Sequence, residues 1–356
     1  MANTSIQSLN FDRLLSALQS RSDAEKWIEC AVWIALEITI FTGNILTLKI
    51  ILTNKDLRTI PNYLIVSLAC SDLGLGIFGG IPTLGVLVEA KWPFNEALCQ
   101  LQGVSALTMA SASVLNLTLM AINRYFKVVK TRRYQAYFTK RRTLAYIALV
   151  WLMAFLVAAS YLLIGNRYSF NPGKVFCFIQ PQHHIFQIFI SIVYITFPSA
   201  VIVYCYQKVY MVIKTHNKAL SGWGARRIDP KVGRAEHWAD HKARPEPGTH
   251  ARGISVQEIN ITRTLFSIVV AFLVCWTPAF VIDIIDVYQL RWSLGRRAYV
   301  SYTFLVATSS TVNPILYGIM NPAFRKEYLK CLVYLRIQNN SVVTTNTSPS
   351  NRDSKI

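Results

Sequence analysis

The stretch 99-CQLQGVSALTMASASVLNLTLMAINRYFKVVK-130 decides the fold. No charged side chain occurs in it before Arg124, which Lys127 and Lys130 follow. Cys99 and Arg124 are 25 residues apart (124 − 99), and a helix of that length is about 37 Å long, slightly more than the hydrocarbon core of a bilayer. The stretch therefore predicts a membrane-spanning helix that holds a thiol at one membrane face and a guanidinium at the other.

The composition of the whole chain is typical of an integral membrane protein. Of its 356 residues, 53% are hydrophobic and only 15% are charged, which excludes a soluble domain of this length. The net charge of +19 raises the alternative of nucleic-acid binding, but the basic residues lie between apolar spans and not on one soluble module. We interpret them as basic cytoplasmic loops, and we expect no nucleic-acid partner.

Seven apolar spans divide the chain, at about 27–52, 61–89, 99–130, 143–164, 185–213, 256–287 and 298–320. They predict an all-α membrane protein, a seven-transmembrane helix bundle with an eighth amphipathic helix on the cytoplasmic face. The predicted parts are an extracellular N-terminal arm (1–26), the seven-span domain (27–320) with a long, basic, disordered loop at 214–254, the amphipathic helix (321–336) in contact with membrane lipid, and a disordered tail (337–356).

The charges of the loops predict the orientation. The basic loops at 54–58, 127–142 and 214–254 all fall on the side of the C-terminus, which places that side in the cytoplasm and the N-terminus outside. We therefore expect a multi-pass protein of the plasma membrane. The tripeptide Asn3-Thr4-Ser5 is then a glycosylation site on the outer arm, or a chance match to that short pattern.

Two opposite charges lie at the predicted inner ends of two spans. Arg124 ends the third span, and Glu258 begins the sixth, twenty residues before Pro278. If the spans pack as a bundle, these side chains form an ion pair that closes the cytoplasmic side and breaks when the sixth helix tilts. The alternative is that both charges simply face solvent near the membrane surface.

Several short motifs occur in the same order and spacing as in one family. They are Gly43-Asn44, SLACSD with Asp72, Cys99, Asn123-Arg124-Tyr125, Trp151, Cys177, Pro198 with Tyr206, FLVCWTP at 272–278, NPILY at 313–317 and Phe324-Arg325. Together they resemble the rhodopsin-like (class A) G-protein-coupled receptors over residues 27–333. Asn123 departs from that pattern, because an acid more often precedes the arginine, and so does Thr131, where a proline is common.

Details of the chain are most similar to the melatonin-receptor branch. They are Asn123-Arg124-Tyr125, the loop YSFNPGKVFCF and the run Asn-x-x-Phe-Arg-Lys-Glu-Tyr after the seventh span. Two residues depart from that branch, since Pro314 is a residue that the branch usually replaces and Tyr194 stands where the branch carries a histidine.

The resemblance implies roles for particular residues. It implies a disulfide between Cys99 and Cys177, and palmitoylation of Cys331, for which an unmodified thiol is the alternative. It implies a mid-membrane sodium site at Asp72, Ser113, Asn313 and Asn44, where a water-mediated polar network is the alternative. It implies an activation switch made of Asn123, Arg124, Tyr125, Glu258, Tyr206, Trp276, Phe272, Pro278, Pro314 and Tyr317. The implied partner is a heterotrimeric G protein of the inhibitory class, activated by outward movement of the sixth helix.

The same resemblance limits the chemical classes of ligand that we expect. Ala307 stands where an opsin carries its Schiff-base lysine, so we expect no retinal, and Ala106 stands where amine receptors carry an aspartate. An amine would need Asp283, Asp286, Glu37 or Glu89 as its counter-ion, and we interpret Asp283 and Asp286 as solvated charges at the outer end of the sixth helix. The implied pocket lining is Ala106, Met109, Ala110, Phe178, Gln180, Ile190, Tyr194, Trp276, Phe280, Asp283 and Tyr302. It indicates a small apolar or aromatic ligand.

Other functions are less consistent with the sequence. A short peptide bound at the outer rim is the alternative ligand. A transporter would show internal repeats and paired broken helices, and none is evident in the sequence. The six histidines and seven cysteines show no nucleophile–base or metal-ligand spacing, so we do not expect an enzyme. A membrane protein that binds a partner without signalling is a further alternative.

Overall fold

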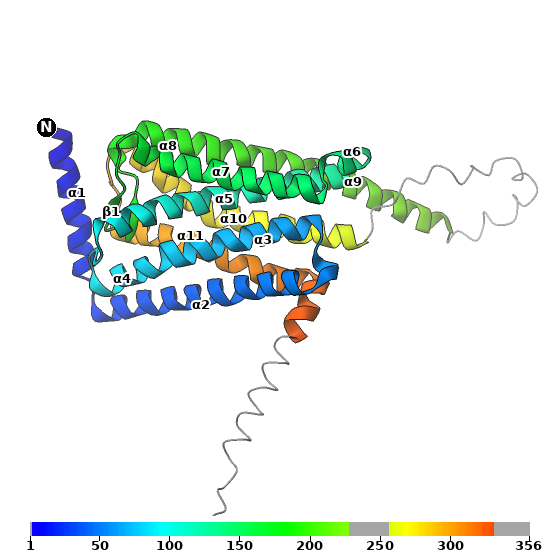
Figure 1. Ribbon diagram of the computed structural model, residues 1–356, viewed down its shortest axis with the longest axis horizontal. Helices are drawn as coiled ribbons and strands as arrows, with labels where there is room; N and C mark the ends of the chain where they lie inside the picture. Colours follow the sequence, from blue (N-terminus) through cyan, green and yellow to red (C-terminus); the bar gives the residue numbers. More distant parts are fainter. Residues whose placement is uncertain (1, 228–255, 331–356) are drawn as a thin grey trace, which may run out of the picture.

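The structure, a computed structural model, describes residues 2–227 and 256–330, and these form a bundle of long helices that lie side by side (Figure 1). The long helices are α2 (Asp23–Thr53), α3 (Ile60–Gly74) continued by α4 (Ile81–Glu89), α5 (Glu96–Val128), α7 (Lys140–Leu163), α8 (His184–Ile190) continued by α9 (Phe197–Arg227), α10 (Val256–Gln289) and α11 (Arg296–Met320). They match the seven predicted spans within a few residues, apart from the longer inner end of α9.

Six of these helical units are long and apolar enough to cross a membrane. The exception is α11, which carries the polar run Thr308-Ser309-Ser310-Thr311 and Asn313. Most of these polar side chains are buried, and α11 packs between α10 and α2 along the same direction as the other helices (Figure 1). Its polar residues face the protein interior, which is where a membrane helix can carry them.

The first element, α1 (Ala2–Gln19), lies across one end of the bundle (Figure 1). The hairpin of β1 (Ser169–Asn171) and β2 (Phe176–Phe178) lies at the same end, which we call the hairpin end. Leu14 of α1 packs with Trp292 and Tyr299, and Arg13 donates hydrogen bonds to two backbone carbonyls at 292 and 294. The predicted polar arm thus contains a helix that covers part of the hairpin end.

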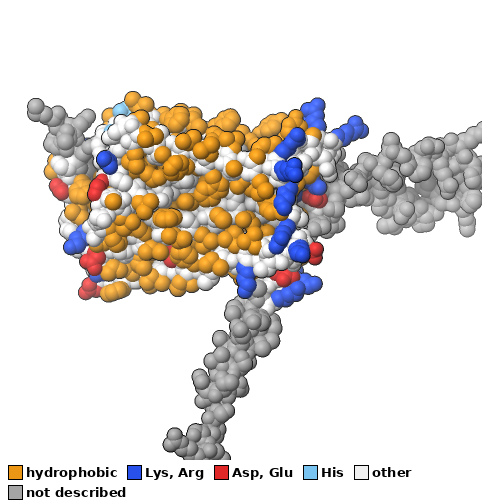
Figure 2. Space-filling model, viewed as in Figure 1, with side chains coloured by type: hydrophobic (Ala, Val, Ile, Leu, Met, Phe, Trp, Pro, Cys, Tyr) orange, Lys and Arg blue, Asp and Glu red, His pale blue; other side chains and the backbone are white. Residues whose placement is uncertain are grey.

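Most of the basic side chains that are visible in Figure 2 lie at the opposite end. This end contains helix α6 (Thr131–Tyr137), the 3-10 turn η1 (Lys55–Leu57) and a helix at 322–330. Helix α6 falls within the predicted basic loop at 127–142. Phe324 is fully buried and packs on Tyr317, whereas Arg325 and Lys326 are exposed, as expected of an amphipathic helix. We call this the basic end. The predicted disordered loop at 214–254 is wrong for residues 214–227, which continue helix α9. The rest of that loop, the tail at 337–356 and residues 331–336 with Cys331 lie outside the described residues.

Two helices contain a π-helical turn. The segments are η2 (Leu75–Gly80), between α3 and α4, and η4 (Ser191–Thr196), between α8 and α9; a 3-10 turn, η3 (Pro181–His183), precedes α8. The run Gly79-Gly80-Ile81-Pro82 explains the first, because two glycines and a proline weaken the regular helix. Such turns are frequent at functional sites, and both of these line the cavity described below.

The main apolar core lies in the half of the bundle toward the basic end. It joins α3, α5, α9, α10 and α11 through residues such as Leu68, Leu117, Tyr206 and Phe272. The core lies between the cavity and the cluster of charges around Arg124.

Gly43 lets α2 approach α11 closely, because a Cβ there would overlap the ring of Pro314.

Candidate functional site

A cavity of about 110 Å³ lies in the bundle toward the hairpin end. Eight of the eleven predicted pocket residues line it, namely Ala106, Ala110, Phe178, Ile190, Tyr194, Trp276, Asp283 and Tyr302. Met109, Gln180 and Phe280 do not line it. Met109 packs against Gly74, and Gln180 accepts a hydrogen bond from Gln182. Apolar cavities of about 150 Å³ can hold benzene, so this conformation has room for a group slightly smaller than one aromatic ring.

A second set of lining residues was not predicted. It comes from α2, from η2, from β2 and from α11, and it includes Trp33, Glu37, Gly76, Gly80, Phe176, Thr303 and Val306. Ala307, the residue at the retinal-lysine position, also lines the cavity. The sequence feature that indicates this wall is the pair Gly76 and Gly80, because two glycines four residues apart leave space for a neighbouring side chain.

Glu37, one of the candidate counter-ions named from the sequence, is an acidic residue of this wall. Its side chain is 8% exposed, and among the described residues its Oε2 atom has no hydrogen-bond partner. The carboxyl group lies against the backbone of η2, where a Cβ at Gly80 would overlap it and one at Gly76 would lie 3.0 Å from Oε2. A buried carboxyl without a partner is costly, so Glu37 is a candidate contact for a polar group of a ligand.

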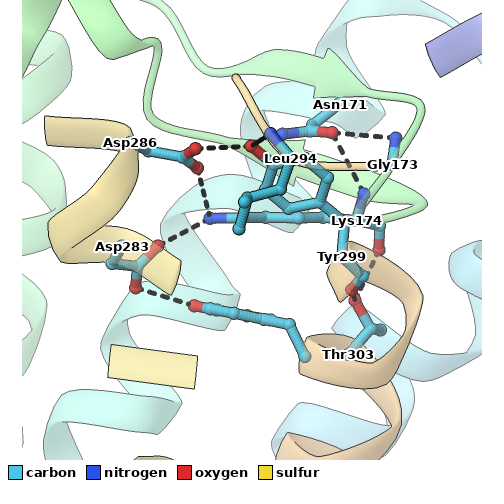
Figure 3. A network of polar contacts seen from close by, with 9 residues as sticks. Asn171, Gly173, Lys174, Asp283, Asp286, Leu294, Tyr299 and Thr303 are labelled. Carbon is cyan, nitrogen blue, oxygen red and sulfur yellow. Dashed lines mark hydrogen bonds and ion pairs between the residues drawn. The ribbon is translucent and has the colours of Figure 1, made fainter. Parts of the chain in front are cut away.

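Asp283 and Asp286 are buried, and the expectation that they are solvated is wrong. Their residues are 9% and 1% exposed, and both carboxylates face Lys174 of the hairpin loop (Figure 3). The Lys174 ammonium lies 2.6 Å from Asp283 Oδ1 and 4.0 Å from Asp286 Oδ2. Lys174 lies in the loop between the fourth and fifth predicted spans, and the structure folds its side chain into the bundle beside the cavity. Glu89, the remaining candidate counter-ion, is exposed and does not line the cavity.

Asp72 is the centre of a polar network deeper in the bundle. Its carboxylate accepts hydrogen bonds from Asn313 and from Ser310, each at 2.8 Å. Ser113, predicted as a partner, instead donates to Ser71 at 3.0 Å, and Asn44 donates to the Ser310 carbonyl at 3.3 Å. The oxygen atoms around Asp72 suit a small, hard cation such as sodium. Ser310 is a contact of Asp72 that was not predicted from the sequence.

Trp276 connects the cavity to the apolar core. Its ring lines the cavity and stacks on Phe272 at 5.2 Å between centroids, with 21° between the planes. Its Nε1 donates to Ser309 Oγ at 3.0 Å, which ties α10 to α11. A ligand that moves the Trp276 ring would therefore displace a residue of the core.

Arg124 and Glu258 form the predicted ion pair at the basic end. Arg124 Nη1 lies 2.9 Å from Glu258 Oε2, and Arg124 Nη2 donates to Asn123 Oδ1 at 2.9 Å. Lys127 also contacts Glu258, at 3.4 Å. The Asn123 amide donates in turn to Tyr134 Oη of α6 at 3.3 Å. The pair holds the ends of α5 and α10 together, which is the closed arrangement of the predicted switch.

Two tyrosines of the predicted switch, Tyr206 and Tyr317, are buried in the core. The hydroxyls of Tyr206 and Tyr317 have no hydrogen-bond partner within residues 2–227 and 256–330. Pro278 and Pro314 interrupt the backbone hydrogen bonding of α10 and α11 on the same helices as Trp276 and Tyr317. Tyr125, by contrast, lies away from the pair, with its ring near Phe126 and Tyr204. The two buried hydroxyls can gain partners if the helices rearrange.

The disulfide between Cys99 and Cys177 is present, so this prediction is confirmed. It fixes β2 to the first turns of α5, beside Tyr168, whose hydroxyl donates to the Ala158 carbonyl. Burial raises the pKa of Tyr168 well above its usual value, so it stays a hydrogen-bond donor. Asn3 lies in α1, and its glycosylation remains a prediction.

Comparison with known proteins decides the family. The sequence matches the family described as "7 transmembrane receptor (rhodopsin family)" over residues 43–317. The chain belongs to the rhodopsin family. Members of this family are G-protein-coupled signalling receptors of the plasma membrane and not enzymes, and this receptor shares that general function and location.

This receptor has nearly the same sequence identity to relatives that are named for different ligands. It is 24% identical to the melatonin receptor type 1C of Xenopus laevis, over 89% of this chain and 70% of that protein. It is 25% identical to the neuromedin-K receptor of Oryctolagus cuniculus, over 83% of this chain and 59% of that protein. The structure is similar to squid rhodopsin, with a TM-score of 0.72, 21% identity and coverage of 88% of this chain and 87% of that one. These likenesses support the class A fold and a weak similarity to the melatonin branch.

Proposed function

We propose that this receptor binds a small apolar or aromatic ligand in the cavity and activates a heterotrimeric G protein by outward movement of α10. The observation that carries the proposal is the position of Trp276. It lines the cavity, it stacks on Phe272 in the core, and its helix also carries Glu258, the partner of Arg124. One rigid element thus joins the ligand site to the charges that keep the basic end closed.

The chemistry of the wall defines the ligand further. Most lining side chains are apolar or aromatic, and Asp283 is already paired with Lys174. Glu37 is left as the carboxyl that faces the cavity without a partner among the described residues. We therefore expect a ligand with one ring-sized apolar part and one hydrogen-bond donor for Glu37. A peptide at the rim is less favoured, because α1 covers part of that end.

Three finer features belong to the same proposal. The hairpin end faces outside, because the basic side chains gather at the other end (Figure 2). The G protein is of the inhibitory class, as the likeness to melatonin receptors suggests. A sodium ion binds the Asp72 network and stabilises the closed state, since carboxylate, hydroxyl and amide oxygens converge there.

The experiment is a ligand panel on cells, read by cyclic-nucleotide and calcium assays. The panel holds small aromatic compounds with and without a donor group, and it includes melatonin because of the relatives with that name. Each active compound is then tested on Ala110→Phe, which fills the cavity, and on Ala148→Phe, an exposed position of α7 that serves as the matched control. Loss of response in Ala110→Phe alone supports the proposal, and equal responses in both variants contradict it.

A further inference from the structure

Lys174 is a buried lysine in the turn between β1 and β2. Its side chain is 0% exposed, and its ammonium is held by two carboxylates of α10, Asp283 at 2.6 Å and Asp286 at 4.0 Å (Figure 3). Tyr302 Oη donates to Asp283 Oδ2 at 3.2 Å, and Tyr299 Oη donates to Asp286 Oδ1. Phenol groups of α11 therefore orient both carboxylates, in addition to the contacts that the ammonium makes.

Aromatic rings complete the surroundings of the ammonium. Lys174 Nζ lies 4.0 Å from the ring centroid of Phe178 and 4.4 Å from that of Tyr302, with Tyr299 farther away at 5.9 Å. Carboxylates together with aromatic faces are the combination by which proteins recognise ammonium ligands. A lysine that only needed a salt bridge would not require rings on several sides.

The loop around Lys174 is built to hold this residue in place. Asn171 Oδ1 accepts hydrogen bonds from the backbone N–H groups of Gly173 at 2.9 Å and Lys174 at 3.0 Å. Thr303 Oγ1 donates to the Lys174 carbonyl at 2.6 Å (Figure 3). The next residue, Val175, has φ = 57°, a left-handed conformation that is strained for a β-branched residue. Such strain persists only where neighbouring contacts determine the conformation, and here those contacts place the lysine.

The site is continuous with the cavity. Phe178, Asp283 and Tyr302 contact the Lys174 ammonium and also line the cavity. We propose that these residues form a binding site for a primary ammonium group, and that Lys174 fills it as an internal ligand. Our identification of the cavity as the ligand site rests on the proposed function, whereas the ammonium site rests on the contacts of Lys174 alone. A free amine reaches Asp283 only if it displaces this lysine.

Chemical rescue on the purified receptor tests the proposal. Lys174→Ala removes Cγ, Cδ, Cε and Nζ and leaves the site open for ethylammonium or n-propylammonium. The measurement is the unfolding temperature of wild type and variant at increasing amine concentration, in a constant total concentration of chloride salt. We expect a lower unfolding temperature for Lys174→Ala, a saturable rise of that temperature with either amine, and no rise for wild type.

Three controls decide the interpretation. Ethanol and n-propanol have similar size without the charge and should give no rise. Lys174→Ala combined with Asp283→Asn should respond much less to the amines, because the carboxylate nearer to the ammonium position is gone. A variant as stable as wild type, an absent rise, or an equal rise with the alcohols overturns the proposal.

A second measurement applies if Lys174→Ala does not reach the cell surface. The cells are then grown with ethylammonium or with ethanol, and surface receptor is counted with an antibody to an epitope tag. Recovery with ethylammonium alone supports the ammonium site, and no recovery overturns it. Both measurements are independent of ligand and G protein, so failure of the proposed function would leave their results unchanged.

Discussion

Arg124 of α5 and Glu258 of α10 are joined by an ion pair of 2.9 Å, in which the arginine side chain is 1% exposed and the glutamate 27%. Asn123, where most of the family carries an acid, supplies a neutral acceptor to the same guanidinium. A hydrogen bond to a neutral group is about half as strong as one to a charged group. We therefore expect the closed state of this receptor to depend mainly on Glu258.

The first prediction concerns Asn123→Asp. The new carboxylate would accept from Arg124 Nη2 with full charge, and Tyr134 could donate to it in place of the lost amide contact. We expect lower agonist-free G-protein activation, by roughly fivefold if the added restraint is about 1 kcal/mol. The measurement is basal activation at matched surface expression. Higher basal activity in Asn123→Asp would show that Asn123 does not restrain Arg124.

The second prediction concerns the disulfide. Cys99→Ser or Cys177→Ser should reduce surface expression and ligand binding, because the bond fixes the hairpin that carries Phe178 and Lys174. The double variant should resemble either single variant, since all three lack the same bond. Cys70→Ser, an exposed free cysteine of α3, is the matched control. Normal expression and binding of the single variants would contradict the prediction.

The third prediction concerns sodium and Asp72. If sodium binds the Asp72 network in the closed state, sodium chloride should lower agonist affinity relative to choline chloride at equal ionic strength. Asp72→Asn removes the charge that attracts the ion and should abolish the difference. The measurement is agonist affinity in the two salts. A salt response that is the same in wild type and Asp72→Asn would exclude this site.

The fourth prediction concerns Glu37. A ligand donor that pairs with this buried carboxyl should lose about 1.5–3 kcal/mol with Glu37→Gln, which is roughly tenfold to a hundredfold in affinity. Glu89→Gln, at an exposed glutamate outside the cavity, should leave affinity unchanged. Compounds without a donor group should bind both variants equally. Equal affinity of a donor-bearing ligand for wild type and Glu37→Gln would remove Glu37 from the ligand site.

The spans and the paired residues could be predicted because the membrane restricts the chain strongly. Long apolar runs without charge have few alternatives to spanning helices, and Cys99 and Arg124 fall at the two ends of one such run. The partner of Arg124 was predictable in the same way, because Glu258 is an acid at the inner end of another span. These features depend on local sequence and on the direction of each helix.

The surroundings of Lys174 could not be predicted, since they depend on the path of a loop. In the sequence, Lys174, Asp283 and Asp286 look like ordinary charges at the ends of spans. Their burial follows from the turn at Asn171, the disulfide at Cys177 and the docking of the hairpin between α10 and α11. The position of Met109 could not be predicted either. A small rotation of its helix decides whether this side chain faces the cavity or Gly74.

We propose that the contact between Arg124 and Glu258 keeps this receptor closed. The most direct measurement is agonist-free nucleotide exchange on purified inhibitory-class G protein, with equal amounts of wild type, Glu258→Ala and Arg124→Ala receptor in the same membranes. We expect exchange roughly fivefold faster than wild type with Glu258→Ala, and none above background with Arg124→Ala. Exchange with Glu258→Ala that is equal to or slower than wild type, at normal folding of both variants, would contradict it.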